Sequence, residues 1–418
     1  KMKNITTLLL LSLLTINTYA QLPKGDRTLA WQVDMTQNLN YDSAFAYAQT
    51  GCMESIHLTF AWSSIEPNAG NFDANYINNI LDIADIYYPA YGTKVELQIP
   101  TMNTNVKVTP TDLVSTDFDD LTMINRFKVL LDTLFIHIPN VELSALNIGN
   151  ESDAYMGTDV TQYNQYKMFL DSVVPYAKQL YFNLHGTDLK VGTTFTYDGL
   201  VEASTSSLCQ TVNNGLDIVS TTYYPLNPDF TMESPAVVSS DFSNLVNIYS
   251  DTLKPIYFVE CGYASSDSCN SSEALQAQFF QNVFSAWDTH YANIKYLTLF
   301  KTTDWSQQEV NDLGVFYGIT DIIFLEYLRT LGVRTWDNDG TNKLAYETIL
   351  CELSNRGWCS VNCGITGIDE QIKTDFVSVY PNPTSGLINI DTKKSVKQIK
   401  IYNSLGKYNT RNSATELY

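Results

Sequence analysis

Short apolar runs alternate with longer amphipathic runs through most of the chain, and this alternation constrains the fold more than any other feature. Eight of the short runs are mostly apolar and rich in β-branched or aromatic residues, which is typical of strands. They are residues 28–34, 55–61, 94–99, 143–148, 190–194, 217–222, 255–259 and 296–301. Strands that are buried on both faces read as apolar runs, and parallel neighbours are joined by crossover helices. The pattern therefore predicts a closed (β/α)8 TIM barrel.

The segments between the strand candidates support the barrel, because apolar residues recur in them at helical spacing. Examples are residues 125–138, 163–181 and 274–287. An open doubly wound sheet is the alternative, but neither GxGxxG nor GxxxxGK[ST] follows a strand candidate. After the eighth run we expect an insertion over residues 324–340, in which 337–340 form a turn, and then a closing helix over 344–353.

The first 20 residues resemble a secretory signal peptide, with two lysines, an apolar run from Leu8 to Leu14 and a small-residue site ending at Ala20. A bilayer-spanning helix needs about 20 apolar residues, so this run is too short to be an anchor. No other segment reaches that length. We expect a secreted chain with a signal peptide over 1–20, a barrel over 21–363, a linker over 364–375 and a small β module over 376–418.

Charge and cysteine content exclude several functions. The formal net charge of −20 argues against a nucleic-acid partner, since such proteins need a cationic surface. Seven cysteines without a CxxC pair and only four histidines argue against a zinc or iron–sulfur site, and we expect no metal and no cofactor. In an oxidising compartment we expect local disulfides between Cys261 and Cys269 and within the group Cys351, Cys359 and Cys363.

Two glutamates stand where a barrel builds its active site, at the C-terminal ends of strands. Glu151 follows the fourth strand candidate and Glu260 follows the seventh. Cleavage of a glycosidic bond needs one protonated and one ionised carboxyl group. A lone glutamate at such a place is more often a solvated loop residue, but two at opposite sides of one barrel mouth predict a catalytic pair.

The sequences GNES, which ends in the pair Glu151–Ser152, and VECGY, which contains Glu260, resemble those of glycoside hydrolase clan A, within it families 5 and 53. The resemblance spans roughly residues 22–353 and implies a retaining enzyme that acts on β-linked poly- or oligosaccharides. It implies that Glu151 is the general acid/base and Glu260 the nucleophile, and that Asn150 contacts the sugar 2-hydroxyl group.

Further residues at the strand ends are candidates for substrate binding. In clan A a tyrosine after the sixth strand often donates to the nucleophile, while an aromatic plug of the barrel is the alternative reading. The indole after the eighth strand is expected to stack on a sugar ring. The W-x-x-I-E-P signature of the clan places a tryptophan after the second strand, and its glutamate, Glu66, is expected to hold the loop. The candidates are Tyr223, Tyr224, Trp305, Trp62, Asn103 and Asp34.

Serine-based chemistry is not supported, because no GxSxG motif occurs and His57 and His185 have no partners at triad spacing. Near the C-terminus, VYPNP and IYNSLGK resemble the type A sorting domain of the type IX secretion system. This implies export machinery as a partner, location outside the cell or on its surface, and an incomplete sorting module. The alternative function is a non-catalytic protein that binds glycans or adheres through the barrel mouth. A transglycosylase is a weaker third possibility.

Overall fold

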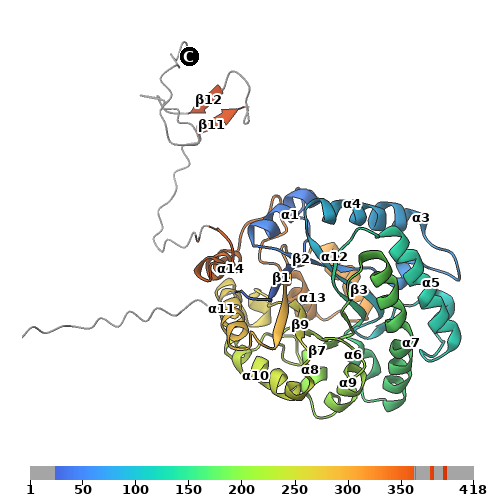
Figure 1. Cartoon of the computed structure of the whole chain (residues 1–418). Helices are drawn as coiled ribbons and strands as arrows, with labels where there is room; N and C mark the ends of the chain where they lie inside the picture. The colour runs from blue at the N-terminus through green and yellow to red at the C-terminus, as the bar shows by residue number, and fades with distance from the viewer. Residues whose placement is uncertain (1–23, 362, 364–376, 381–388, 393–418) are drawn as a thin grey trace, which may run out of the picture. The chain divides into compact units, whose positions relative to one another are not determined.

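The computed structural model describes residues 24–361, 363, 377–380 and 389–392. The chain divides into two units, residues 1–365 and 366–418 (Figure 1). In the second unit the described residues form an antiparallel pair of strands, β11 (Val377–Tyr380) and β12 (Asn389–Thr392). The predicted signal peptide, the linker and the rest of the sorting module lie outside the described residues.

The parallel strands of the first unit overlap with the eight predicted runs. They are β1 (Thr28–Trp31), β2 (Ser55–Thr59), β3 (Lys94–Asn103), β5 (Leu143–Asn150), β6 (Val191–Gly192), β7 (Thr194–Thr196), β8 (Val219–Tyr223), β9 (Ile256–Cys261) and β10 (Ile294–Leu299). Neighbouring strands pair in parallel in the order β6-β5-β3-β2-β1-β10-β9-β8-β7. Only Thr193 separates β6 from β7, which together form the predicted fifth strand, so the ring closes and the barrel prediction is confirmed.

Helices surround the strands (Figure 1). The main ones are α1 (Tyr41–Thr50), α4 (Asp82–Ala90), α5 (Leu121–His137), α7 (Val160–His185), α9 (Ser206–Asn213), α10 (Val238–Ile248), α11 (Glu273–Thr289) and α14 (Leu344–Asn355). Several begin where a side-chain oxygen accepts a free backbone N–H group. Asp159 accepts from Thr161 at the start of α7, and Ser272 accepts from Leu275 at the start of α11. Among the described residues, no helix is both long and apolar enough to cross a membrane.

The barrel strands send apolar side chains outward to the helices and several polar side chains inward. On β2, Ile56 belongs to the apolar core shared with the helices, whereas the next residue, His57, is buried and lines a cavity inside the barrel mouth. On β3, Leu97 packs outward, and Glu96, directly opposite His57 in the register, contacts His57. Because neighbouring residues of a strand face opposite sides, polar side chains gather inside the barrel while apolar ones pack against the helices outside it.

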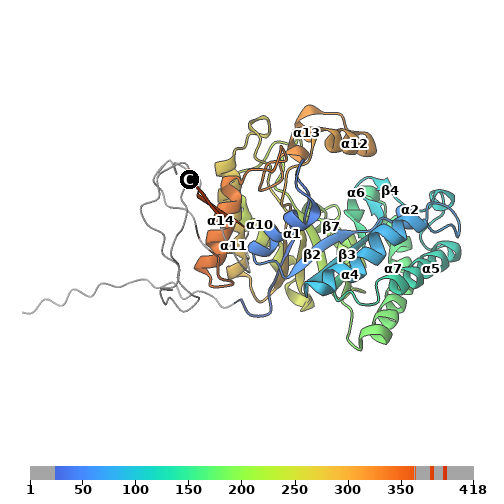
Figure 2. The same cartoon turned by 90° about the horizontal axis from the view of Figure 1, so that it is seen from above.

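An insertion after β10 lies over one end of the barrel. It contains α12 (Gln307–Tyr317), which begins in a capping box formed by Ser306 and Glu309, and α13 (Ile322–Arg329). Figure 2 shows both helices at the end of the barrel where the short strand β4 (Val106–Lys107) and helix α6 (Ser152–Met156) also lie. Residues 337–340 form the predicted turn, in which the Gly340 amide donates to the Asp337 carbonyl at 3.0 Å. The predicted closing helix corresponds to α14.

The disulfides correct one sequence prediction. The pair Cys351–Cys363 forms within the expected C-terminal group, but Cys261 and Cys269 are both free and buried. Cys261 points from β9 into the apolar layer below the helices, while the Cys269 thiol donates to the Ile323 carbonyl at 3.7 Å. Closeness in sequence therefore did not bring their sulfur atoms together.

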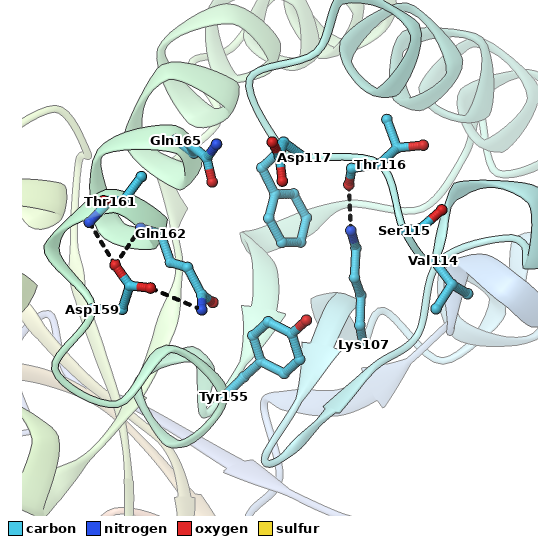
Figure 3. A pocket seen from close by; sticks show the side chains of 11 residues that line it. Lys107, Val114, Ser115, Thr116, Asp117, Tyr155, Asp159, Thr161, Gln162 and Gln165 are labelled. Atoms are coloured by element: carbon cyan, nitrogen blue, oxygen red, sulfur yellow. Dashed lines mark hydrogen bonds between the residues drawn. The ribbon is translucent and has the colours of Figure 1, made fainter.

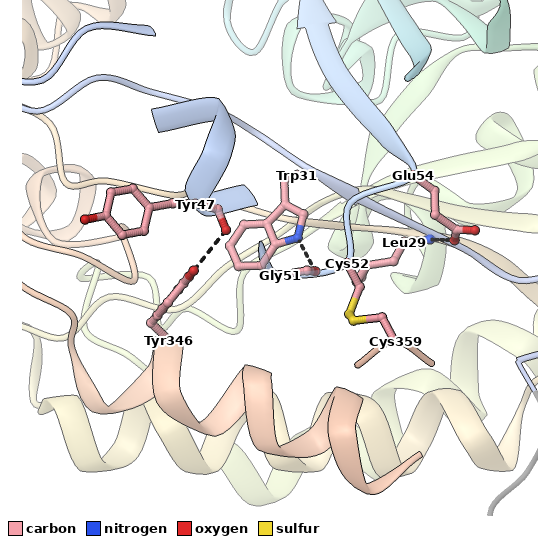
Figure 4. The surroundings of a disulfide bond; sticks show 8 residues. All are labelled: Leu29, Trp31, Tyr47, Gly51, Cys52, Glu54, Tyr346 and Cys359. Atoms are coloured by element: carbon pink, nitrogen blue, oxygen red, sulfur yellow. Dashed lines mark hydrogen bonds between the residues drawn. A yellow bond between two sulfur atoms is a disulfide. The ribbon is translucent and has the colours of Figure 1, made fainter. Parts of the chain in front are cut away.

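A second disulfide, between Cys52 and Cys359, spans 307 residues. It joins the segment before β2 to the segment after α14. Figure 4 shows it beside Trp31, whose indole donates to the Gly51 carbonyl at 3.0 Å, and Tyr346, whose hydroxyl donates to the Tyr47 carbonyl at 2.9 Å. The disulfide and the hydrogen bond between Tyr346 and Tyr47 hold the two ends of the barrel domain together.

We predict that the two disulfides differ in their contribution to stability. Replacing Cys52 and Cys359 by serine should lower the free energy of unfolding more than replacing Cys351 and Cys363, because the first pair closes a much longer loop. The chain-entropy relation gives a difference of about 3 kcal/mol for loops of 307 and 12 residues. Urea unfolding of the two double variants under oxidising conditions measures it. Equal losses would contradict a chain-entropy origin.

Candidate active site

A cavity of about 510 Å³ opens at the barrel mouth and brings Glu151 and Glu260 together. Polar side chains from the strand ends line one part of it, and apolar side chains from the α12–α13 insertion line another. The polar group is Gln32, His57, Thr59, Gln98, Asn103, Thr104, Asn105, Asn150, Glu151, Tyr224 and Glu260. The cavity therefore lies where the sequence predicts the active site, at the C-terminal ends of the strands.

Glu151 reaches the cavity through an unusual backbone conformation directly after β5. Its φ and ψ angles of 47° and 43° are left-handed, which costs roughly 1–2 kcal/mol for a residue with a side chain. Two residues earlier, Gly149 has a φ of 90°, and a Cβ atom there would lie 2.3 Å from the Tyr166 hydroxyl. Only glycine fits at that position. The packed surroundings thus hold Glu151 in a strained geometry, as is common for functional residues.

Glu260 reaches the same cavity through a β-bulge. Phe258 pairs with Thr221 of β8, but the next pair joins Glu260 to Thr222, so β9 carries one extra residue between these pairs. Regular alternation would place Glu260 on the outer face with Phe258. The extra residue turns the Glu260 side chain toward the barrel mouth, which is a known use of bulges beside active sites.

The two carboxyl groups have different partners. Glu151 accepts hydrogen bonds from the hydroxyl groups of Thr104 at 2.6 Å and Thr222 at 2.8 Å. Glu260 accepts one from the Tyr224 hydroxyl at 2.6 Å, and its other oxygen lies 4.0 Å from Nε2 of His57. A hydroxyl group both donates and accepts, whereas a protonated histidine only donates. The environment of Glu260 thus includes a side chain that favours its ionised form.

Burial dominates the protonation of Glu260. It raises the pKa of Glu260 to about 7, the neighbouring His57 opposes this increase, and Glu151 adds to it. Burial also acts on His57 and lowers its pKa, but the carboxylates of Glu96 and Glu260 outweigh burial and raise that pKa above its ordinary value. The state of Glu260 near neutral pH is therefore coupled to that of His57.

Three amide side chains form a polar shelf beside Glu151. The Asn150 side-chain N–H group donates to Asn103 Oδ1 at 3.0 Å, and Asn150 Oδ1 accepts from Gln98 Nε2 at 3.0 Å. These bonds fix the orientation of the Asn150 amide and leave one of its N–H groups and one lone pair for a ligand. The shelf can hydrogen-bond a hydroxyl group that lies between the two glutamates.

Trp305 lines the cavity from the segment after β10, and a buried lysine supports it. The Lys301 ammonium lies 3.5 Å from the centre of the indole ring, and the ring meets Phe300 edge-on with centroids 5.8 Å apart. Lys301 is fully buried and pairs with Asp34 at 3.1 Å. Burial lowers the pKa of Lys301, and Asp34 opposes this effect. Asp34 thus neutralises the lysine and does not line the cavity.

Of the residues predicted from the sequence, the cavity brings together Glu151, Glu260, Asn150, Asn103, Tyr224 and Trp305. Tyr223 points the other way and donates to Asp241 at 2.7 Å, because neighbouring strand residues face opposite sides. Trp62 is fully buried outside the cavity and donates to Glu66 at 2.9 Å. Tyr223 and Trp62 therefore do not line the cavity, in contrast to the prediction from the sequence.

Glu66 holds the loop after β2 together, as expected. Its carboxylate accepts hydrogen bonds from Trp62, the Gly70 amide at 2.8 Å and Arg126 at 2.9 Å. The W-x-x-I-E-P signature is thus explained by loop structure, and its tryptophan serves packing.

Sequence reasoning missed the importance of His57. Its Nδ1 atom contacts Glu96, whose other oxygen accepts from Asn147 at 2.6 Å, so a chain of polar side chains runs across β2, β3 and β5 to Glu260. Triad spacing does not reveal this pair, because the partner of His57 is Glu96 on the neighbouring strand. The available signal was a charged residue at the same inward position of two consecutive apolar strands.

A second cavity, of about 430 Å³, lies beside β4 and the start of α7 (Figure 3). Its lining contains two carboxylates, those of Asp117 and Asp159. Asp159 is used as the cap of α7, where it accepts from the amides of Thr161 and Gln162. This cavity offers no pair of glutamates. Within the described part of the chain, no group of three or more metal-ligating side chains is placed to hold an ion.

Comparison of folds yields matches to solved glycosidase structures. The exo-β-1,4-mannosidase Op5Man5 from Opitutaceae bacterium strain TAV5 has a TM-score of 0.56 at 14% identity, covering 79% of this chain and 60% of that one. A GH5_18 protein from Bifidobacterium longum subsp. longum has a TM-score of 0.58 at 13% identity, covering 80% of each chain. A family 39 glycoside hydrolase from Bacteroides cellulosilyticus WH2 has a TM-score of 0.50 at 14% identity, covering 79% of this chain and 64% of that one.

These matches show a shared barrel fold, and this chain spans less than two thirds of the first and third proteins. No curated protein sequence matches the chain. Residues 378–416 match the family described as the secretion system C-terminal sorting domain, in agreement with the resemblance noted from VYPNP and IYNSLGK.

The buried carboxyl groups predict how stability depends on pH. Burial raises the pKa of Glu260 to about 7, of Asp153 to about 7 and of Asp304 to about 6. A carboxyl group whose pKa is raised by folding stabilises the fold below its unfolded pKa, and this contribution is lost as pH rises through the folded value. The free energy of unfolding should therefore fall between pH 5 and pH 8.

Glu260→Gln tests this dependence, because glutamine keeps the shape and cannot ionise. The variant should match the parent protein at pH 5 and exceed its stability at pH 8 by roughly 1–3 kcal/mol. Urea unfolding at both pH values measures the difference. Glu142→Gln, which removes an exposed carboxyl group, is the control for net charge. If Glu260→Gln were less stable than the parent at pH 8, the ionised carboxylate of Glu260 in the parent would have to be well stabilised, which would contradict the prediction.

Proposed function

We propose that the chain is a retaining glycoside hydrolase that cleaves β-glycosidic bonds, with Glu260 as nucleophile and Glu151 as general acid/base. The observation that carries the proposal is that one cavity holds two glutamates with different partners at the ends of β5 and β9. Cleavage by double displacement needs such a pair. The substrate class suggested by the sequence is β-linked poly- or oligosaccharides.

The first step transfers the sugar to the enzyme. The ionised Glu260 carboxylate attacks the anomeric carbon, and the Glu151 carboxyl group donates its proton to the leaving oxygen as the glycosidic bond breaks. In the second step Glu151 removes a proton from a water molecule, and the resulting hydroxide displaces Glu260. The products are a hydrolysed sugar with retained configuration and a free leaving group.

The hydrogen bonds support this division of roles. Glu151 gains and loses a proton in each cycle, and the hydroxyl groups of Thr104 and Thr222 can donate to its ionised form or accept from its protonated form. Glu260 must be an anion to attack, and His57, when protonated, opposes the effect of burial on it. Because the pKa of Glu260 is raised to about 7 even with His57 beside it, attack should become more efficient as the pH rises through neutrality.

The neighbouring side chains suit a sugar ring. The free N–H group of Asn150 can bond the 2-hydroxyl group, where such bonds strengthen in the transition state. Trp305 presents an aromatic surface held by Lys301, and flat aromatic surfaces pack against apolar ring faces. Tyr224 fixes one oxygen of Glu260, so the other faces His57 and the cavity.

The fold matches favour hydrolysis over the alternative of a non-catalytic glycan-binding protein. Several matched structures are named as glycosidases, among them an exo-β-1,4-mannosidase and a β-glucosidase. A binding protein would also have no use for the buried charge of Glu260, whose ionisation burial opposes. Binding of β-glucans, mannans, galactans and xylans without release of reducing ends would support the adhesive alternative.

The match of residues 378–416 supports export through the type IX secretion machinery and a location outside the cell or on its surface. Two disulfides in the barrel domain suit the same compartment, because disulfides persist in oxidising surroundings.

The roles of the two glutamates predict distinct variant kinetics. Glu260→Ala should lower kcat roughly 10⁴-fold, and azide should restore turnover by filling the vacated face and give a product of inverted configuration. Glu151→Ala should slow substrates with poor leaving groups far more than activated aryl glycosides, since only the former need the proton. Steady-state kinetics and NMR of the products measure both effects, with Glu142→Ala as a surface control. Azide rescue with inversion in Glu151→Ala would reverse the assignment.

We predict that the sorting tail directs export and is not needed for folding or hydrolysis. A chain that ends at Cys363 should keep the melting temperature and the hydrolytic rate of the longer chain, because the tail belongs to a second unit. In the native cell the shortened enzyme should accumulate in the periplasm. Purified protein and cell fractions assayed side by side measure the two effects. Loss of activity in the purified shortened protein would contradict the separation.

A further inference from the structure

The α12–α13 insertion gives the active-site cavity an apolar wall. Facing the cavity are side chains from both helices and from the segment between them, whose polar atoms are two tyrosine hydroxyl groups. They are Leu313, Tyr317, Ile319, Phe324, Tyr327 and Leu328. Figure 2 shows that these helices lie beyond the end of the barrel. The cavity is thus polar at the strand ends and apolar at the insertion.

The apolar wall lies next to the general acid. Asn105, in the turn after β3, donates from its side chain to the Tyr317 carbonyl at 2.9 Å, and the adjacent Thr104 donates to Glu151 at 2.6 Å. Burial raises the pKa of Tyr317, and among the nearby charges Glu151 has a larger effect on it than Glu260. Leu313, one helical turn before Tyr317, lines the cavity on the same face of α12.

This placement identifies the part of the substrate that meets the wall. The proton of Glu151 goes to the leaving oxygen, so the group attached to that oxygen lies beside Glu151. The sugar ring that is attacked lies between Glu260, Asn150 and Trp305, where the polar side chains are. We therefore expect the leaving group beside Thr104, next to the wall to which Leu313 and Tyr317 belong.

We propose that the leaving group of the natural substrate is apolar, so that the enzyme hydrolyses β-glycosides of hydrophobic alcohols. This inference rests on the proposed function and narrows its substrate class. A second sugar in this position would bring hydroxyl groups against Leu313, Ile319 and Leu328, which offer no side-chain hydrogen bond. The hydroxyl groups of Thr104 and Tyr317 are already engaged, the first with Glu151 and the second with Thr104 and Asn103. Burying an unpaired hydroxyl group is unfavourable, whereas burying alkyl or aryl carbon is favourable.

The overall reaction is hydrolysis of the β-glycoside by one water molecule to a free sugar and a hydrophobic alcohol. Glu151 gives its proton to the alcohol oxygen and takes one from water, so the enzyme returns to its starting state. A cavity of about 510 Å³ is within the range of small-molecule sites, roughly 300–1,000 Å³, and accommodates a sugar together with a short apolar group.

A series of n-alkyl β-glycosides tests the proposal, because the members differ in apolar length and hardly in leaving-group acidity. We would measure kcat/KM for methyl, butyl and hexyl β-D-glucosides, mannosides and galactosides, and for the matching disaccharides. The expected result is an increase of about two- to fourfold per methylene, since burying one CH₂ is worth about 0.8 kcal/mol. A flat series, or disaccharides that outperform the hexyl glycoside, would overturn the proposal and leave the hydrolase assignment intact.

Two substitutions on α12 link the effect to the wall. Leu313→Ser should flatten the chain-length series, since Leu313 faces the cavity. Val315→Ser, two residues further on the same helix, is the matched control, because Val315 is 78% exposed and lies outside the cavity lining. A flattening that is equal in both variants would show that helix stability, and not contact with the alkyl chain, sets the preference.

Binding provides a readout that does not need turnover. In Glu260→Gln, calorimetry with methyl and hexyl β-D-glucoside and β-D-mannoside should give tighter binding of the hexyl compound, and Leu313→Ser should remove the difference. Equal affinities would overturn the apolar leaving-group site. Preference for the hexyl compound without hydrolysis in the unsubstituted protein would support the site and refute the proposed hydrolase.

Discussion

The active site depends on burying charged groups inside a ring of apolar strands. Desolvation acts against every ionised carboxylate there, and the barrel answers with a chain of polar contacts from Asn147 through Glu96 and His57 to Glu260. Each member limits the protonation states of the next, so the protonation of Glu260 depends on the whole chain of contacts. These residues lie on β2, β3, β5 and β9, which are far apart in the sequence. They influence one another's charge only because the closed barrel brings them into contact.

Much of the fold could be predicted because each barrel unit leaves a local pattern. The eight strand runs, the closing helix and the positions of Glu151 and Glu260 follow from short-range periodicity and from strand ends. The choice between Tyr223 and Tyr224 could not be made, since it depends on which face of β8 points inward. Trp62 was expected to bind substrate, but its motif belongs to a loop that Glu66 holds in place.

The contacts that sequence reasoning missed are long-range. His57 and Glu96 are 39 residues apart, and Cys52 and Cys359 are 307 residues apart, so no local pattern joins them. The pairing of Cys261 with Cys269 failed for the opposite reason, because closeness along the chain says nothing about which layer of the barrel a side chain enters. The insertion after β10 likewise contributes Leu313 and Tyr317 to the cavity, more than 150 residues along the chain from Glu151, so no local pattern joins them.

The bulge in β9 has a consequence for how this barrel can change. Glu260 faces the mouth because β9 has one residue more than β8 needs, so its direction is encoded by a count of residues as well as by their chemistry. Side chains around it can be exchanged while the count holds. Loss or gain of a single residue between Phe258 and Glu260 would instead reverse the face on which the carboxyl group stands. In this strand the number of residues therefore constrains the direction of the Glu260 side chain more strictly than the identity of its neighbours does.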